Sequence, residues 1–424
     1  MTITRRRFAK GMGIALGLGT LAGPAVVRAQ SKGRVVVIGG GAGGATAAKY
    51  VARDSKGELD VTLVQETPLY STCFYSNLYL GGLRSFDSIT HGYSTLAGKY
   101  GVKPVFERAI EVDTAAKRVR LASGATLDYD ALVVAPGIDI IYDSIEGYSK
   151  AAADYMPHSW QAGPQTLLLK KQLDAMEDGG LFVMAAPPNP FRCPPGPYER
   201  VSMIAHTFKQ SKPNSKILIL DPKTKHSKQA LFQEAWENHY EGMVEWIPGD
   251  FGGEIESVDA ANMTLTAGGE THKAAVANVI PAQRAGAIAQ VAGLTDDNGW
   301  CPIVPATMAS KMAEGVYVVG DACNPGDMPK SAFSANSQAK VAAMAIRHEL
   351  TGSRAFPAKF RNTCWSTVAP DDSIKVGANY EPTDEKISKL DGFISEVGET
   401  AEVREQTKLE ADGWYAGITA DMFS

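Results

Sequence analysis

The sequence has little cysteine, and none of it forms a closely spaced pair. Its 424 residues include five cysteines, and no two of them stand in a C-x-x-C or C-x-x-x-x-C pattern. Such pairs are the local signature of thiol redox motifs. Their absence argues against a nicotinamide-dependent disulfide reductase, so any sulfur chemistry must use cysteines that lie far apart in the chain.

Long apolar segments are also scarce, and the one at the start of the chain is short. "TRRRFAK" (Thr4–Lys10) precedes an apolar run over 11–27 and a small-x-small site that ends at Ala29. This order is typical of a twin-arginine export signal. A membrane anchor is the alternative, but a run of about 17 residues with five glycines and one proline is short for a spanning helix. We therefore expect residues 1–29 to be removed.

The chain has fewer basic than acidic residues. The chain has 42 basic and 47 acidic residues, and removing the five basic residues of the signal lowers the net charge from −5 to about −10. This balance argues against nucleic acid and anionic membrane surfaces as partners. Twin-arginine export carries folded proteins, so we expect a cofactor that is inserted in the cytoplasm and used in the periplasm, where a disulfide can persist.

A Gly-rich turn follows directly after the signal. "GRVVVIGGGAGGATAAKYVAR" contains an expected strand, a G-x-G-x-x-G turn at Gly39, Gly41 and Gly44, and an Ala-rich helix. These glycines permit a tight turn, close approach of a pyrophosphate and close helix packing. Because strand and helix frame the motif, a dinucleotide site is favoured over a merely flexible loop.

The next expected strand, "LDVTLVQE", ends where an acidic residue would bind the adenosine ribose. The usual position of that residue is Gln65, and Glu66 follows it. Either the amide of Gln65 or the carboxylate of Glu66 makes the ribose contact, and the sequence does not distinguish them.

A second cofactor segment lies much later in the chain. "GVYVVGDACN" is an expected strand that ends at Gly320 and Asp321, and helix composition begins near Ser334. Flavin-binding proteins with two dinucleotide domains use such a segment to hold the ribityl and phosphate groups, and the helix N-terminus can stabilise negative charge on the reduced ring. With the crossover strand "YDALVVAPG", these pieces predict FAD, with two further candidate contacts at Lys330 and Ser331.

The middle of the chain begins like another nucleotide unit but lacks its glycines. "FVMAAPPNPFRCPPGPYERV" (Phe182–Val201) starts as a strand, then offers six prolines and Cys193 where a phosphate loop would need glycine. Neither NADH nor NADPH is therefore expected to bind there. No metal site is expected anywhere in the chain.

Four segments together resemble one known family. "YSTCFYSNLYLGG", "FRCPPGPYERVSMIAH", "VYVVGDACNPGDMPKSAFSANSQAKVAA" and "NTCWSTVAPDDSIKVGANY" are similar to the flavoprotein subunit of flavocytochrome c sulfide dehydrogenase, and the similarity covers essentially the whole mature chain. The resemblance implies a covalent bond from Cys73 to the 8α-methyl of FAD. It also implies a redox-active disulfide between Cys193 and Cys364 beside the flavin, which spacing alone could not pair.

The roles of residues near Cys193 follow from that resemblance and from helix chemistry. A helix is expected to start near Pro197, and a thiol at a helix N-terminus has a lowered pKa and leaves readily from a disulfide. Glu199, in the first turn, is either an acid/base group near the disulfide or a solvated carboxylate that stabilises the helix dipole. Cys301 and Cys323 could be free or paired, and we favour free, buried thiols.

The expected fold class is α/β, with two Rossmann-like dinucleotide-binding domains of the glutathione-reductase type and a small C-terminal α/β domain. A discontinuous FAD domain is predicted over 31–148 and 296–355. The second domain, which carries Cys193, covers 149–295, and the C-terminal domain covers 356–424. Core packing is the favoured role for the aromatic residues of this last region, namely Trp365, Tyr380, Trp414 and Tyr415.

The function expected from the resemblance is that of a periplasmic sulfide dehydrogenase subunit. It would oxidise hydrosulfide through the disulfide and covalent FAD and pass electrons to a cytochrome c subunit. Sulfide:quinone oxidoreductase is the nearest alternative, but residues 380–424 contain no amphipathic basic stretch for docking on a membrane. A non-enzymatic flavin-binding assembly factor is the second alternative, and it would have no need of three redox-placed cysteines.

Overall fold

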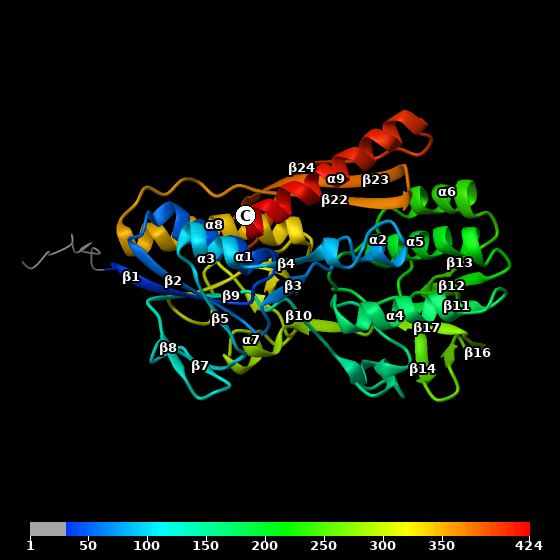
Figure 1. The fold of residues 1–424 in the computed structure, drawn as a ribbon, viewed down its shortest axis with the longest axis horizontal. Coiled ribbons are helices and arrows are strands. Elements are labelled where there is room, and N and C mark those ends of the chain that lie inside the picture. The colour runs from blue at the N-terminus through cyan, green and yellow to red at the C-terminus, as the bar shows by residue number, and fades with distance from the viewer. Residues whose placement is uncertain (1–30) are drawn as a thin grey trace, which may run out of the picture. The chain divides into compact units, whose positions relative to one another are not determined.

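A computed structural model describes residues 31–424, which form one compact unit. A first parallel sheet has the strand order β20-β9-β1-β2-β5, and its strands β1, β2, β5 and β9 are labelled in Figure 1. All its pairings are parallel. In the central strand β1 every residue except Arg34 is buried, as expected for a strand covered on both faces. The strands are β1 (Gly33–Ile38), β2 (Leu59–Gln65), β5 (Lys103–Phe106), β9 (Ala131–Val134) and β20 (Val316–Val318).

Helices from both ends of the chain cover this sheet. Helix α1 (Ala42–Ser55) packs against α8 (Ala332–Thr351), and α3 (Ser94–Tyr100) lies next to α1. Ala45, Ala47 and Ala48 of α1 are fully buried, and their small side chains let neighbouring elements approach closely. The expected strand, turn and helix of the first nucleotide unit are therefore present.

A second parallel sheet has the order β13-β12-β11-β17. Its interior strand β11 (Leu181–Ala185) leads into the proline-rich turn, which ends where α5 (Gly196–Ser211) begins. The second domain thus keeps the nucleotide-binding scaffold that the sequence predicts. Its other elements are α4 (Pro164–Ala175), β12 (Lys216–Leu220), α6 (Gln229–Tyr240), β13 (Val244–Ile247), β17 (Val276–Val279) and a side sheet of β14 (Ile255–Asp259), β15 (Thr264–Ala267) and β16 (Glu270–Lys273).

The C-terminal region is an antiparallel sheet followed by a long helix. Strands β22 (Phe360–Ala369), β23 (Asp372–Pro382) and β24 (Ile387–Ile394) pair in chain order. Helix α9 (Ala401–Phe423) runs along β23 and reaches α1 (Figure 1). Strand β22 also contacts α5 and α6 of the second domain, so this region joins both parallel sheets.

Short elements complete the unit. They are β3 (Leu69–Ser71), α2 (Ser76–Leu80), β4 (Thr90–Gly92), β6 (Ala109–Asp113), β7 (Arg118–Leu121), β8 (Thr126–Asp128), β10 (Ile138–Ile140), β18 (Gln283–Ala285), α7 (Ala287–Val291), β19 (Cys301–Pro302), β21 (Cys323–Asn324) and the 3₁₀ turns at Asp87–Ile89, Tyr142–Ser144, Ala152–Asp154, Gly249–Phe251 and Gly320–Ala322.

The expected signal at 1–29 lies outside the described residues. Within 31–424, none of the helices has the length and apolar character needed to cross a membrane. The domain boundaries stay predictions, since the described residues form a single compact unit.

Candidate active site

The turn between β1 and α1 can be built only with glycine at two positions. Gly39 has a φ of 96°, and a Cβ placed there would lie 2.3 Å from the carbonyl oxygen of Ala135. A Cβ on Gly44 would lie 1.7 Å from the carbonyl oxygen of Gly39. Gly41 is the N-cap of α1, and its extended backbone carries no side-chain cap. The turn therefore stays open to a ligand at a helix N-terminus, where an anionic group is stabilised.

A cavity of about 520 Å³, here called the glycine cavity, opens above this turn. It brings together seven of the residues that the sequence predicts, whereas Gly44 lies beneath the turn. At the end of β2, Gln65 Oε1 accepts a hydrogen bond from the Gly40 N–H at 2.8 Å. The predicted residues that line it are Gly39, Gly41, Gln65, Glu66, Cys73, Gly320 and Asp321.

Asp321 is a buried carboxylate with an unused acceptor. Its Oδ1 has no hydrogen-bond partner, and its Oδ2 lies 3.7 Å from Nη1 of Arg192. Burial raises the pKa of Asp321, and the charge of Arg192 opposes that rise. A free acceptor in a cavity wall fits a hydroxyl-bearing ligand, because an unpaired buried oxygen is costly unless a ligand pairs with it.

Lys330 and Ser331 lie differently from the prediction. The Lys330 ammonium donates to the carbonyls of Asp321 and Cys323 at 2.8 and 2.7 Å and lies 3.6 Å from the Trp300 ring centroid. It supports the loop instead of lining the glycine cavity. Ser331 caps α8 by accepting from the Ser334 N–H at 3.1 Å, and it lines the neighbouring pocket.

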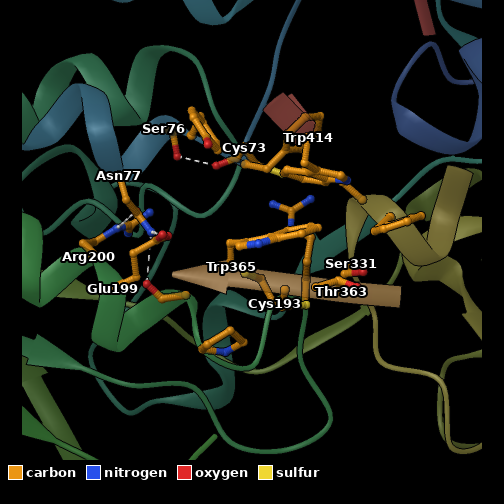
Figure 2. Close-up of a pocket in the computed structure, with 18 of the residues that line it drawn as sticks. Cys73, Ser76, Asn77, Cys193, Glu199, Arg200, Ser331, Thr363, Trp365 and Trp414 are labelled. Atoms are coloured by element: carbon orange, nitrogen blue, oxygen red, sulfur yellow. Dashed lines mark hydrogen bonds between the residues drawn. The ribbon is translucent and has the colours of Figure 1, made fainter. Parts of the chain in front are cut away.

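That neighbouring pocket, here called the thiol pocket, has a volume of about 80 Å³ and is lined by three cysteines, Cys73, Cys193 and Cys364. Figure 2 shows Cys73 and Cys193 approaching it from different elements. Cys73 and Arg192 line both cavities, so the two spaces adjoin. All five cysteines are recorded as free thiols. The bond between Cys193 and Cys364 implied by the resemblance is therefore not formed in this structure, and it stays a proposal.

Two hydrogen bonds hold the backbone at Cys193 in an unusual conformation. Its φ is 58°, unusual for a residue with a side chain, and its N–H donates to the carbonyl of Lys330 at 2.8 Å. Its own carbonyl accepts from the N–H of Gly196, the first residue of α5. The predicted helix start is confirmed to within one residue. The expected lowering of the thiol pKa is wrong, because burial raises the pKa of Cys193 well above its ordinary value.

Cys364 lies on β22 and has more polar surroundings. Asn362 Nδ2 donates to its sulfur at 3.3 Å, and Ser331 Oγ lies 2.6 Å from Asn362 Oδ1. Burial raises the pKa of Cys364, while Asn362 and the ammonium of Lys228 oppose the rise. The two sulfurs that the resemblance pairs are thus chemically unequal.

Glu199 lies in the first turn of α5, and both of its oxygens bind protein groups. Oε2 accepts from Asn77 Nδ2 at 2.7 Å, and Oε1 accepts from the Thr367 N–H at 3.0 Å. Burial raises the pKa of this carboxyl. Arg200 Nε donates to Asn77 Oδ1 at 3.0 Å, which orients the Asn77 amide (Figure 2). A half-buried carboxyl with a raised pKa in the wall of the thiol pocket suits acid/base chemistry better than a solvated surface role.

The four aromatic residues of the C-terminal region divide into two groups. Tyr380 and Tyr415 are buried in the core, as predicted. Trp365 and Trp414 are half-buried, stack with centroids 5.4 Å apart, and line the thiol pocket (Figure 2). Trp414 also packs against the core, as predicted, whereas Trp365 belongs to the pocket wall.

Sequence reasoning missed four polar residues of this site. Arg192 and Arg200 stand next to Cys193 and Glu199 in the chain, so inspection of those neighbours would have found them. Asn77 lies in the same segment as Cys73 and carries no distinctive signal. Lys228 lies in "KTKHSK", which has the composition of an ordinary surface loop.

The remaining two cysteines are not part of the site. Cys301 and Cys323 are direct partners in the register of β19 and β21, and both are free and fully buried, as we favoured.

Three protein-family models match separate parts of the chain. Residues 166–281 match the central part of the sulfide dehydrogenase (flavocytochrome c) flavoprotein chain. Residues 357–423 match the flavin-binding part of flavocytochrome c sulfide dehydrogenase. Residues 33–164 match the pyridine nucleotide-disulfide oxidoreductases.

Among curated proteins, the sulfide-quinone reductase of Aquifex aeolicus (strain VF5) is 34% identical over 109 residues, which span 26% of this chain and 25% of that protein. The mitochondrial sulfide:quinone oxidoreductase of Mus musculus is 24% identical over 337 residues, or 73% of this chain and 70% of that protein. The chain thus spans only a quarter of the first relative and about two thirds of the second.

Solved structures share the fold. The sulfide:quinone oxidoreductase of Aquifex aeolicus superposes with a TM-score of 0.73 at 17% identity and covers 92% of each chain. A NAD-dependent persulfide reductase from A. fulgidus gives a TM-score of 0.62 at 16% identity and covers 89% of this chain and 77% of that one. These likenesses support the predicted glutathione-reductase-like α/β fold, and the structure shows that the C-terminal domain is built on an antiparallel sheet.

Proposed function

The chain belongs to the sulfide dehydrogenase flavoprotein chains of flavocytochrome c, a family of FAD-binding oxidoreductases, and we propose that it oxidises hydrosulfide through a Cys193–Cys364 redox pair. The observation that carries this proposal is the contact between two cavities. Cys193 and Cys364 line the small thiol pocket, which adjoins the larger glycine cavity at Cys73 and Arg192. A pocket of about 80 Å³ suits a small sulfur anion and excludes a nicotinamide dinucleotide.

FAD fits the glycine cavity on the residues present. The Gly39–Gly44 turn offers backbone N–H groups at the start of α1 for the pyrophosphate, and Asp321 Oδ1 is a free acceptor for a ribityl hydroxyl. Gln65 Oε1 already accepts one hydrogen bond, from Gly40, and the carboxylate of Glu66 in the same cavity wall is the proposed acceptor for the ribose. When bound, FAD supplies the two-electron acceptor that oxidation of sulfide requires.

Cys73 is the proposed covalent anchor of this cofactor. It lies between β3 and α2, lines both cavities, and its carbonyl is held by Ser76 Oγ at 2.6 Å. After acid precipitation the yellow colour should stay with the wild-type protein and move to the supernatant in Cys73→Ser. Release of flavin from the intact wild type without proteolysis would contradict covalent attachment.

The proposed first step is an exchange of sulfur–sulfur bonds at the Cys193–Cys364 pair. Hydrosulfide attacks one sulfur of the Cys193–Cys364 bond, a new S–S bond forms there as a persulfide, and the other sulfur leaves with the bonding pair as a thiolate. Glu199 accepts the proton when the neutral form of the substrate enters. Asn77 and Thr367 hold its two oxygens in the wall of the thiol pocket, and among residues 31–424 it forms no ion pair.

A cytochrome c subunit in the periplasm is the proposed electron acceptor. Membership of the family supports the cytochrome partner, and the twin-arginine sequence supports export. A quinone acceptor is the second candidate, because relatives named sulfide:quinone oxidoreductase share the fold. Mixing sulfide-reduced protein with a cytochrome c and with a soluble quinone in parallel distinguishes the two acceptors.

One anaerobic experiment tests the proposed activity. Sulfide should bleach the flavin absorbance of the purified protein within turnover times, whereas NADH and NADPH should leave it unchanged. An unbleached flavin with sulfide would favour a non-enzymatic flavin-binding protein. Rapid bleaching by NADH would contradict the interpretation of the proline-rich turn.

A further inference from the structure

Lys228 is a buried cation that reaches from the second domain into the C-terminal sheet. It directly precedes α6 with a φ of 59°, and only 6% of its surface is exposed. Its Nζ donates to the carbonyl of Cys364 at 3.1 Å, to Ser366 Oγ at 2.8 Å and to the carbonyl of Ile374 at 3.3 Å. A left-handed backbone costs energy in a residue with a side chain, so the surrounding contacts must hold it in place.

The charge of this ammonium has no carboxylate within ion-pair distance among residues 31–424, and all three of its hydrogen-bond acceptors are neutral. Burial lowers the pKa of Lys228 to about 8, so it remains mostly protonated at pH 7. The groups that favour its charged form are Cys364, then Glu199, then Cys193. A buried charge of this kind is costly unless an opposite charge compensates it.

Cys364 and Cys193 face different groups. Around Cys364, the donor Asn362 and the cation Lys228 favour the thiolate, as does Ser331, whereas Glu199 opposes it. Tyr380 is a further titratable group near Cys364.

Around Cys193, the cations are Arg192 and Arg200. Glu199, Cys73 and Cys364 oppose ionisation there, and burial is the largest effect. Cations thus lie near both sulfurs, whereas a side-chain hydrogen-bond donor, Asn362 Nδ2, contacts the sulfur of Cys364.

We propose that Lys228 is a positioning residue that supplies the counter-charge of the Cys364 thiolate and thereby makes Cys364 the sulfur that leaves when the Cys193–Cys364 bond is opened. This inference rests on the proposed disulfide chemistry. Hydrosulfide then attacks Cys193, a persulfide forms there, and the bonding pair passes to Cys364 beside the ammonium. A thiol of lower pKa leaves faster from a disulfide, so the asymmetry sets the direction of opening.

Alkylation of the reduced holoenzyme tests this proposal directly. The protein is reduced anaerobically, freed of reductant, and exposed to iodoacetamide over a pH series, and the alkylated fraction of each cysteine is read by peptide mass spectrometry. In the wild type, Cys364 should react with a lower midpoint pH than Cys193. A lower midpoint for Cys193 would overturn the proposal without any variant being needed.

Two substitutions separate charge from hydrogen bonding. Lys228→Gln keeps a donor for the carbonyls of Cys364 and Ile374 but removes the charge, and it should raise the Cys364 midpoint by about one pH unit or more, since an opposite charge nearby shifts a pKa by that order. Lys228→Arg should restore most of the shift. An unchanged midpoint in Lys228→Gln, or no recovery in Lys228→Arg, would overturn the proposed counter-charge.

Lys49→Gln is the matched control. Lys49 is equally buried and donates to the carbonyl of Ala420 at 3.0 Å, but it lies on α1 away from the thiol pocket. It should leave both cysteine midpoints unchanged. Sulfide bleaching of the wild type tests the proposed function separately, so a bleached flavin with an unshifted Cys364 would reject only the role of Lys228.

Discussion

Two strand-to-helix turns lie after interior strands of the two parallel sheets, and they differ in backbone chemistry. The turn from β1 to α1 occupies residues 39–41 and is all glycine, so no side chain separates its backbone from the glycine cavity. The turn from β11 to α5 occupies residues 186–195 and contains five prolines, which have no N–H to donate. The first turn can hold a phosphate, whereas the second places a sulfur.

The comparison shows that one arrangement of strands and helices can carry two different functional groups. Both sheets are parallel, and both turns precede a helix, so the same arrangement of strands and helices supports a cofactor in one domain and a reactive thiol in the other. Fold alone does not determine chemistry. The residues of each turn do, and they can be changed one at a time.

The largest effect is expected in the first turn. Gly44→Ala would place a Cβ 1.7 Å from the Gly39 carbonyl oxygen, a backbone atom that cannot move without opening the turn. We expect almost complete loss of FAD-loaded protein, measured by the ratio of flavin to protein absorbance after purification. Gly98→Ala, where a Cβ meets nothing within 4 Å, should load normally.

The same change at the start of α5 sharpens the contrast. A Cβ on Gly196 would have side-chain atoms as its nearest neighbours, from Trp160 at 2.8 Å and from Cys193 at 3.0 Å. Side chains can shift, so Gly196→Ala should keep its FAD. Equal loss of FAD in Gly44→Ala and Gly196→Ala would mean that the two turns are not functionally distinct.

The second largest effect concerns the sulfur pair. Cys193→Ser, Cys364→Ser and the double variant should each lose sulfide-dependent flavin reduction by roughly a thousandfold or more, because residues that act as a unit give non-additive losses. Dithionite should still reduce the bound FAD. Cys301→Ser, on the buried β19 strand, should turn over nearly as wild type.

Mass mapping under non-reducing conditions gives an independent check on the pair. Peptides containing Cys193 and Cys364 should be joined in the oxidised protein. Normal sulfide turnover in either single variant, or separate peptides, would remove the disulfide from the mechanism while leaving the FAD site intact.

The two turns also show what sequence could and could not predict. The glycine turn is a local pattern in which strand, turn and helix follow one another, so Gly39, Gly41 and Gly44 predicted it directly. The pairing of Cys193 with Cys364 joins distant segments, and only the family resemblance suggested it. Lys228 depends on how a loop before α6 packs against β22 and β23, and no local pattern encodes that contact.

The raised pKa of Cys193 shows a second limit of prediction from the sequence. The start of α5 was predictable from the prolines and Gly196, and a helix N-terminus ordinarily lowers a thiol pKa. The structure places this half-buried thiol in the thiol pocket near Glu199, and its loss of solvation outweighs the helix. Burial depends on tertiary packing, so helix position alone gave the wrong sign.

Glu199 is expected to have a smaller effect than the sulfurs. Glu199→Gln keeps the hydrogen-bonding shape beside Asn77 and Thr367 but cannot accept a proton, so flavin reduction by sulfide should slow by roughly a hundredfold. Burial raises the carboxyl pKa, so wild-type activity should fall as the pH drops through that raised value. A pH series of stopped-flow rates should lack this acid limb in the variant, and an identical limb would exclude Glu199 as the base.

The smallest effect is on stability in acid, and it concerns the second domain. His226 stacks on Tyr198 of α5 with centroids 3.6 Å apart, and burial lowers its pKa to about 4. The unfolded chain binds a proton near pH 6.5 while the folded protein does not, so stability falls as the pH drops from about 6.5 towards 4. His226→Phe keeps the stacking and removes that proton, so it should reduce the loss of unfolding free energy between pH 7 and pH 5 by about 2 kcal/mol. Denaturant titrations at the two pH values measure this difference, and the loss that remains should include the share of His158, whose pKa burial also lowers to about 4. If His226→Phe and wild type lost the same unfolding free energy between pH 7 and pH 5, His226 would take up its proton in the folded state. Its ring would then be more accessible to solvent than its burial indicates.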